Sequence, residues 1–156
     1  MTDFNQAFSI AEKYKNQNKK IAFTNGCFDI IHVGHIRYLK KASECGDCLL
    51  VGLNSDSSVA KIKGSGRPLV SQDERKEILE AFECVDEVII FDESTPFELI
   101  KAVKPDVIVK GGDWKAEDII GKDIVEKNGG KTVTIEYIPG RSTTEFINKI
   151  KESKPR

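Results

Sequence analysis

The segment KIAFTNGCFDIIHVGHIRYL, residues 20–39, decides the expected fold. An apolar run ends at a turn around Gly26, and the chain's two histidines, His32 and His35, follow where a helical pattern begins. A strand that leads through a glycine turn into a helix is typical of the first unit of an α/β sheet. The N-terminus of such a helix has unpaired N–H groups and attracts anions. We therefore expect a strand, an anion-binding turn and a helix in this segment.

The rest of the chain repeats this alternation. We expect strands at residues 20–26, 48–55, 86–91, 105–112 and 131–138, and helices at residues 3–18, 33–46, 56–64, 71–83, 95–103, 117–130 and 142–154. Apolar strands separated by helices indicate a parallel sheet that is covered on both faces. The prediction is an α/β, doubly wound, Rossmann-like fold with five parallel strands. A length of 156 residues fits one domain, residues 1–156.

Composition argues against several classes of partner. Apolar residues make up 39% of the chain, charged residues 31%, and the formal net charge is −1, so no strong field attracts a nucleic acid or an acidic membrane. No apolar run reaches the ~20 residues of a membrane-spanning helix. The first 20 residues are polar with mixed charge, unlike a signal peptide. We expect a cytoplasmic protein that binds neither membranes nor nucleic acids.

The cysteines and histidines do not make a convincing metal site. Cys45 and Cys48 form a CxxC pair, which can indicate zinc or redox chemistry, but no second pair accompanies it. Redox pairs of the thioredoxin type begin a helix, whereas this pair lies between a helix end and a strand start. Two histidines without a third ligand are a poor zinc set. We expect packing thiols and no protein-bound metal, with the redox or zinc role as the alternative.

Polar and glycine-rich stretches follow four of the expected strands. In doubly wound sheets, ligands bind at the carboxyl ends of strands, where the strand order reverses. The stretches that should meet there are GCF at 26–28, NSD at 54–56, KGGDW at 110–114 and PGRSTT at 139–144. We expect one binding site at this edge. The plainer alternative for the histidines is that one caps the helix and the other packs.

The stretch GCFDIIHVGH, residues 26–35, resembles the GxFDxxHxGH signature of the cytidylyltransferase-like nucleotidyltransferases. The Ser-Thr-Thr at residues 142–144 is similar to the second element of that superfamily. From Lys20 onward the chain is most similar to the heptose 1-phosphate adenylyltransferases, which make ADP-heptose for lipopolysaccharide cores. Residues 1–18 lie outside the strongest match. In many bacteria this activity is half of a kinase–transferase fusion. The chain lacks a kinase half, so we expect a separate sugar kinase to act upstream.

The resemblance implies transfer of AMP from ATP to a sugar 1-phosphate, with release of pyrophosphate. A phosphomonoester has a second pKa near ~6 and is already anionic at neutral pH, so no general base is required. Mg²⁺ should accompany the triphosphate, bound by phosphate and water. Family habit suggests a homodimer. The alternatives are a glycerol-3-phosphate cytidylyltransferase that uses CTP and, in another class, a non-catalytic nucleotide-binding module. The sugar anomer and the base remain open.

The resemblance also assigns roles to particular residues. The catalytic candidates are His32, His35 and Lys63. The candidates for nucleotide and phosphate binding are Gly26, Cys27, Phe28, Gly34, Lys61, Gly111, Asp113, Arg141, Ser142, Thr143 and Thr144. The substrate-side candidates are Asp29, Asn54, Asp56, Arg67 and Arg75. Plainer alternatives are a helix cap for Ser142–Thr144, a solvated surface charge for each lysine, and a helix-face ion pair for Arg75. We further expect the glycine-containing segment 61–68 to be a mobile lid.

Overall fold

The computed structural model describes residues 1–112, 114–136 and 143–153. Its centre is a sheet of five parallel strands, β1 (Ile21–Gly26), β2 (Cys48–Asn54), β3 (Glu87–Phe91), β4 (Val107–Gly111) and β5 (Lys131–Ile135). The spatial order is β3-β2-β1-β4-β5. The chain starts at the centre, extends to one edge and then returns to build the other half, so the order reverses between β1 and β4. The predicted doubly wound parallel sheet is confirmed.

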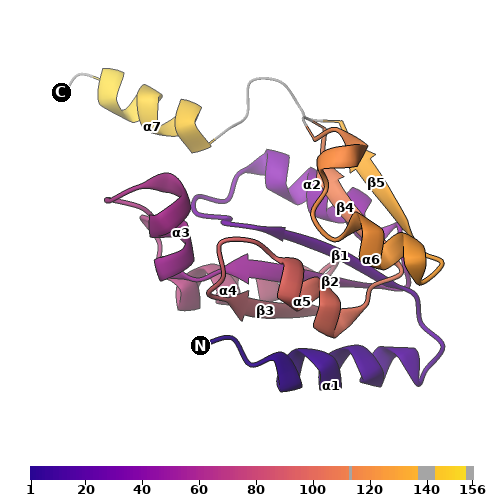
Figure 1. The fold of residues 1–156 in the computed structure, drawn as a ribbon. Coiled ribbons are helices and arrows are strands. Elements are labelled where there is room, and N and C mark those ends of the chain that lie inside the picture. Colours follow the sequence, from indigo (N-terminus) through magenta and orange to yellow (C-terminus); the bar gives the residue numbers. More distant parts are fainter. Residues whose placement is uncertain (113, 137–142, 154–156) are drawn as a thin grey trace.

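Helices cover both faces of this sheet (Figure 1). One face packs against α1 (Phe4–Lys15), α5 (Phe97–Val103) and α6 (Lys122–Lys127). The other packs against α2 (Val33–Ser43) and α4 (Gln72–Glu80). The strands β1 to β4 contribute side chains to both apolar cores, which explains why they are nearly continuous apolar runs, whereas β5 contributes Val133 and Ile135 to one core only.

The N-terminal helix α1 is an integral part of one core. Ala7 and Ala11 are fully buried, and Tyr14 is 6% exposed, although this helix lies outside the strongest sequence resemblance. Figure 1 shows α1 lying along the sheet beside α5. The Tyr14 hydroxyl donates to Glu87 Oε1 at 3.0 Å, which ties the helix to the edge strand β3. Among the described residues, no helix has both the length and the apolarity needed to cross a membrane.

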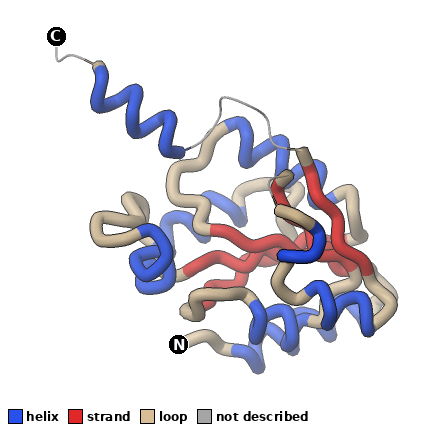
Figure 2. Tube along the Cα trace, turned by 45° about the horizontal axis from the view of Figure 1, so that its top comes forward, coloured by secondary structure: helices blue, strands red, loops and turns tan. Residues whose placement is uncertain are grey.

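Two elements differ from the sequence-based expectation or stand apart from the core. The helix predicted at 117–130 is wrong in extent: a short 3₁₀ turn, η1 (Ala116–Asp118), precedes the shorter helix α6, and Gly121 separates them. Gly121 has φ of +86°, and a Cβ there would lie 2.7 Å from Ile100 Cδ1, so no side chain fits without a shift. The last helix, α7 (Thr143–Glu152), has no buried residue and lies away from the sheet in Figures 1 and 2.

Three aspartates fix the amino ends of the central strands. Asp47 precedes β2 and accepts from Lys20 N at 2.8 Å, beside β1. Asp106 precedes β4 and accepts from Ile21 N at 2.7 Å, again on β1. Asp86 precedes β3 and accepts from Leu49 N at 2.8 Å, on β2. Each carboxylate binds the neighbouring strand, so the aspartates reinforce both the order and the register of four strands.

Candidate active site

A cavity of about 230 Å³ lies at the carboxyl end of the sheet, where β1 and β4 separate. The cavity is lined by the end of β1 and the turn after it, by α2, and by residues at and after the ends of β4 and β5. The structure brings seven of the predicted residues together here, namely Gly26, Cys27, Phe28, His32, Gly34, His35 and Gly111. A cavity at the topological switch point is the expected ligand site of such a sheet.

The two histidines cap α2 reciprocally. His32 is the N-cap residue, and its Nδ1 accepts from Gly34 N at 3.1 Å. His35 is three residues further on, and its Nδ1 accepts from His32 N at 3.3 Å. This arrangement is a capping box built from imidazoles. Because Nδ1 acts as the acceptor in both rings, the neutral form of each carries its proton on Nε2. The spacing of His32 and His35 therefore fixes both tautomers.

The two rings form a packed aromatic group. Their centroids are 4.0 Å apart, and the Phe28 ring lies 5.4 Å from that of His35. His32 is 7% exposed. Burial, and secondly the proximity of His32, lowers the pKa of His35 to about 4. At neutral pH His35 is therefore an uncharged hydrogen-bond donor next to the positive end of α2, and it contributes polarity without adding a full charge.

The turn after β1 is held in an unusual conformation. Phe28 has φ of +46°, in the left-handed region that non-glycine residues rarely adopt. Its ring packs over Gly26, where a Cβ would lie 3.0 Å from Phe28 Cε2. A side chain at position 26 would require this ring to shift. Backbone strain at a ligand-binding turn persists where the surroundings determine it, and here the surroundings include a buried arginine.

Arg75 on α4 is fully buried and stabilises this turn by hydrogen bonds to the backbone. Its Nη1 donates to Cys27 O at 2.5 Å and to Asn54 O at 2.9 Å, which joins the ends of β1 and β2. Its Nη2 donates to Asp56 Oδ1 at 2.8 Å, and its Nε to Val70 O at 2.9 Å. Four of its five N–H donors thus have partners within the protein. This geometry favours a positioning role for Arg75, Asn54 and Asp56 over contact with a substrate.

Asp29 anchors the end of the predicted lid, at Arg67, and the residues Leu69 and Val70 that follow it. The residue is 4% exposed, and its Oδ2 accepts from Arg67 Nε at 2.6 Å. Its Oδ1 accepts from Leu69 N at 2.8 Å and from Val70 N at 3.0 Å. Asp29 and Arg67, both predicted to face substrate, are therefore partners of each other. The loop is tied down from Arg67 onward, whereas Gly64 and Gly66 have φ near +90° and would accept a Cβ without contact.

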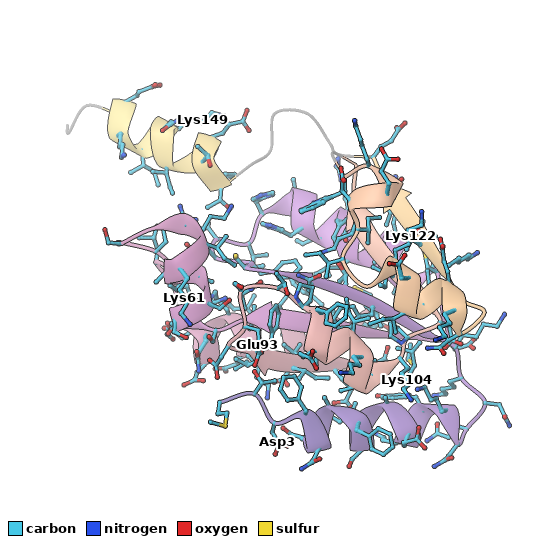
Figure 3. The ribbon with its side chains drawn as sticks, in the orientation of Figure 1. Asp3, Lys61, Glu93, Lys104, Lys122 and Lys149 are labelled. Atoms are coloured by element: carbon cyan, nitrogen blue, oxygen red, sulfur yellow. The ribbon has the colours of Figure 1, made fainter. Side chains whose placement is uncertain are left out.

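Lys61 and Lys63 are exposed on α3 (Asp56–Lys63), outside the cavity lining. Figure 3 shows α3, with Lys61 labelled, on the side of the molecule where α7 and Lys149 lie. The two ammonium groups act on different neighbours. The charge of Lys63 counteracts the burial that raises the pKa of the Cys27 thiol, while that of Lys61 acts on Asp92. Of the two, Lys63 is the one whose charge acts on the Cys27 thiol in the β1 turn.

The start of α7 reaches the histidine pair. The Phe146 ring stacks on the His32 ring with centroids 5.9 Å apart and planes 13° apart. Thr143 Oγ1 donates to Ile30 O at 3.5 Å, and Thr144 is exposed. Asp113, Arg141 and Ser142 lie outside the described residues. The contacts of Phe146 with His32 and of Thr143 with Ile30 bring the start of α7 beside the HxGH motif.

The family model described as cytidylyltransferase-like matches residues 23–156. The chain belongs to the cytidylyltransferase-like family. The predicted class, nucleotidyltransferase, is thereby confirmed. The chain is 54% identical over 141 residues to the bifunctional protein HldE of Geobacter metallireducens, and 51% identical over 144 residues to that of Wolinella succinogenes.

These matches cover 90% and 92% of this chain but only 29% and 30% of the two relatives, so the chain spans less than a third of their length. Among solved structures, a lipopolysaccharide core biosynthesis protein from Thermoplasma volcanium is 28% identical, with a TM-score of 0.62. That match covers 77% of this chain and 97% of the other. Sequences similar to this chain therefore occur in proteins of quite different length.

Several residues that line the cavity of this cytidylyltransferase-like chain were not predicted as site residues. They are Asn25, Arg37, Tyr38, Lys41, Lys110, Trp114, Ile135 and Glu136. Lys110 and Trp114 belong to the KGGDW stretch after β4, so the strand-end rule points to them. The sequence does not point to Tyr38, because a tyrosine within an amphipathic helix is usually interpreted as a residue of the apolar core. Its hydroxyl donates to Val109 O at 3.0 Å and pairs with Thr24 Oγ1 at 2.7 Å, which links α2 to β4 and β1.

The CxxC cysteines lie at the opposite end of the sheet from this cavity. Cys48 Sγ donates to Lys20 O at 3.7 Å and Cys45 Sγ to Lys41 O at 3.5 Å. Burial raises the pKa of both thiols, which opposes thiolate chemistry. Within the described ranges, no three His, Cys, Asp or Glu side chains are grouped closely enough to hold a metal ion.

Proposed function

We propose that the chain transfers AMP from ATP to a heptose 1-phosphate, giving ADP-heptose and pyrophosphate for lipopolysaccharide synthesis. The observation that carries this proposal is the switch-point cavity, in which two imidazoles cap a helix N-terminus. The resemblance to heptose 1-phosphate adenylyltransferases supplies the substrates. The bifunctional relatives, of which this chain matches under a third, agree with a transferase half that occurs in larger fusions.

The proposed mechanism requires positioning and charge stabilisation. The sugar phosphate is anionic at neutral pH and attacks the α-phosphate directly. The imidazoles, each protonated on Nε2, donate to phosphate oxygens as negative charge moves to the leaving pyrophosphate. The N-termini of α2 and α7 add their unpaired N–H groups. Lys63 approaches from the α3 side and compensates charge when the substrates are bound.

Mg²⁺ would lower the charge of the triphosphate and orient it. Asp29 has Arg67 and two backbone N–H groups as partners, and the described part of the chain has no cluster of carboxylates near the histidines. These residues fit a metal that is held mainly by phosphate oxygens and water. A homodimer and a separate upstream sugar kinase are further parts of the proposal. Size-exclusion chromatography with light scattering tests the first.

Pyrophosphate release tests the proposed reaction. The purified chain is incubated with each of ATP, CTP, GTP and UTP, crossed with heptose 1-phosphate, glucose 1-phosphate and glycerol 3-phosphate. We expect rapid release only with ATP and heptose 1-phosphate. Preference for CTP with glycerol 3-phosphate would replace the proposal by the cytidylyltransferase alternative. Nucleotide binding without turnover in any combination would favour the non-catalytic module.

A further inference from the structure

Lys110, at the carboxyl end of β4, is a buried cation in the wall of the active-site cavity. The residue is 9% exposed, and it lines the same cavity as His32 and His35. Its Nζ donates to Asn25 Oδ1 on the neighbouring strand β1, and it lies 5.7 Å from the centroid of the Trp114 ring. Both partners are uncharged. Among the described residues, no carboxylate forms an ion pair with Lys110.

A buried ammonium with neutral partners is costly, because burial removes hydration that an amide and an aromatic ring replace only in part. Burial lowers the pKa of Lys110 to about 8. Elsewhere in this chain, a buried cation has a counter-charge: Arg75, which is fully buried, pairs with Asp56 at 2.8 Å. An anionic ligand that binds in the cavity can supply the counter-charge for Lys110.

The position of Lys110 indicates which anion could supply this counter-charge. Asn25 directly precedes Gly26, and the turn at Gly26–Phe28 is a candidate for binding the phosphates of the nucleotide. The anion site thus has β1 and Lys110 on one side and the N-terminus of α2 on the other. In the proposed reaction, the α-phosphate of the nucleotide and the phosphate of the acceptor must approach each other here, and two anions repel.

We propose that Lys110 binds the phosphate oxygens at the point where the nucleotide and the acceptor meet. This inference rests on the proposed function and deepens it, since it assigns a residue to the repulsion between the two substrates. Asn25 and Trp114 hold the ammonium in place before the substrates arrive. The phosphate comes from the nucleotide, from the acceptor or from both, and separate binding measurements distinguish these sources.

The test compares wild type with Lys110→Met, which keeps the length of the side chain and removes its charge. Isothermal titration calorimetry measures binding of α,β-methylene-ATP with Mg²⁺, of heptose 1-phosphate, and of adenosine, which has no phosphate. We expect Lys110→Met to weaken binding of at least one phosphorylated ligand about 10- to 100-fold, the usual value of a hydrogen bond to a charged group. Adenosine should bind equally to both proteins. Lys110→Arg should recover part of the loss.

Lys15→Met is the matched control. Lys15 is a partly buried lysine whose Nζ donates to Val103 O at 2.8 Å near the amino end of β4, and burial lowers its pKa as well. Its loss should leave the affinities for all three ligands unchanged. Equal affinities of wild type and Lys110→Met for both phosphorylated ligands would overturn the proposal, as would an equal loss for adenosine. Pyrophosphate release by wild type is scored separately, so the proposed reaction can stand while this inference fails.

A second measurement applies even if Lys110→Met does not fold. Phosphate binding should charge the fraction of Lys110 that is neutral, so wild type should take up protons on binding near pH 8, detected by titration in buffers of different ionisation enthalpy. The other titratable or charged groups that line the cavity are His32, the N-cap residue of α2, His35, Arg37, Tyr38 and Lys41 from α2, Cys27 from the β1 turn, and Glu136 after β5. His35, with its pKa of about 4, and Cys27, whose pKa burial raises, do not titrate near pH 8. Absence of proton uptake by wild type would contradict the proposal.

Discussion

At the residue scale, the same atoms of the HxGH motif both cap α2 and set the tautomers of the two histidine rings. Nδ1 of each histidine completes the capping box of α2, and the same contact assigns the proton of the neutral ring to Nε2. The glycine between the histidines supplies one of the N–H donors in this arrangement. Structure and chemistry are therefore coupled at His32 and His35, and substitutions must be chosen so that the two contributions separate.

We expect His32→Ala and His35→Ala to lower kcat about 10²- to 10³-fold, because each removes a donor that acts on charge developing in the transition state. KM for ATP should change much less. His32→Asn is the control for capping, since asparagine is a good N-cap residue. It should keep the melting temperature close to that of wild type and still lose activity. A variant of either histidine with near wild-type kcat would show that its ring has no catalytic role.

The pKa of His35 predicts an acid-dependent loss of stability. The folded-state pKa of about 4 lies below the ordinary value of 6.5, so the unfolded chain binds the proton first as the pH falls. Stability should be unaffected above pH 6.5 and should decrease between pH 6.5 and 4, by roughly 3 kcal/mol at most. Urea unfolding at pH 7, 5.5 and 4.5 should show a weaker pH dependence for His35→Gln. Parallel pH profiles for the two proteins would contradict this account.

At the element scale, the segment after α3 divides into a free part and an anchored part. Gly64 and Gly66 face open space, whereas Arg67, Leu69 and Val70 are bound to Asp29. A loop lid needs a hinge, and the boundary at Arg67 gives this one a fixed end. Movement should therefore be confined to the residues around Lys63 and the two glycines.

Limited trypsin digestion tests this division. Cleavage after Lys61 and Lys63 should be fast in the free protein and should slow when ATP, Mg²⁺ and a sugar phosphate are bound. Lys63→Ala should lower turnover with little change in melting temperature, because the exposed side chain has few packing contacts to lose. Asp29→Asn removes the charge that holds Arg67, so protection by the ligands should be weaker in this variant. Equal cleavage with and without ligands would mean that the segment is not a lid.

Element by element, the sequence predicted the sheet well and the roles of single side chains less well. Strands such as residues 48–54 are apolar runs whose character depends only on burial from both sides, so their pattern is unambiguous. The helix predicted at 117–130 failed because the periodicity continues across Gly121, and only the closeness of Ile100 requires a break there. The charged segment QDERKEIL suggests that Arg75 is an exposed surface residue. Its burial depends on the carbonyls of β1 and β2, which local sequence does not reveal.

At the scale of the whole molecule, α1 joins a part outside the family model to the common core. The family match begins at residue 23, yet Ala7, Ala11 and Tyr14 fill one face of the sheet. Without α1, apolar side chains of β1, β3 and α5 would meet water. We therefore expect the N-terminal helix to unfold together with the rest of the chain.

Tyr14→Ala should lower the free energy of unfolding by about 3 kcal/mol or more, the usual cost of removing a buried aromatic ring. Urea denaturation followed by circular dichroism measures this change. Phe8→Ala, at an α1 position that is 49% exposed, is the matched control and should change stability by much less. If the two variants were equally stable, α1 would not belong to the cooperative unit.

The three aspartates at the amino ends of the strands have a consequence for how this fold can change. Asp47, Asp86 and Asp106 hold four strands in order at one end of the sheet, and all ligand contacts assigned above lie at the other. A connection at the carboxyl ends can therefore be exchanged without disturbing the contacts that set the strand register. This separation makes the fold evolvable: new base or sugar preferences can arise from loop replacement alone. A chimaera that takes the connection after β4 from a relative with a different nucleotide preference should fold normally and shift only its specificity.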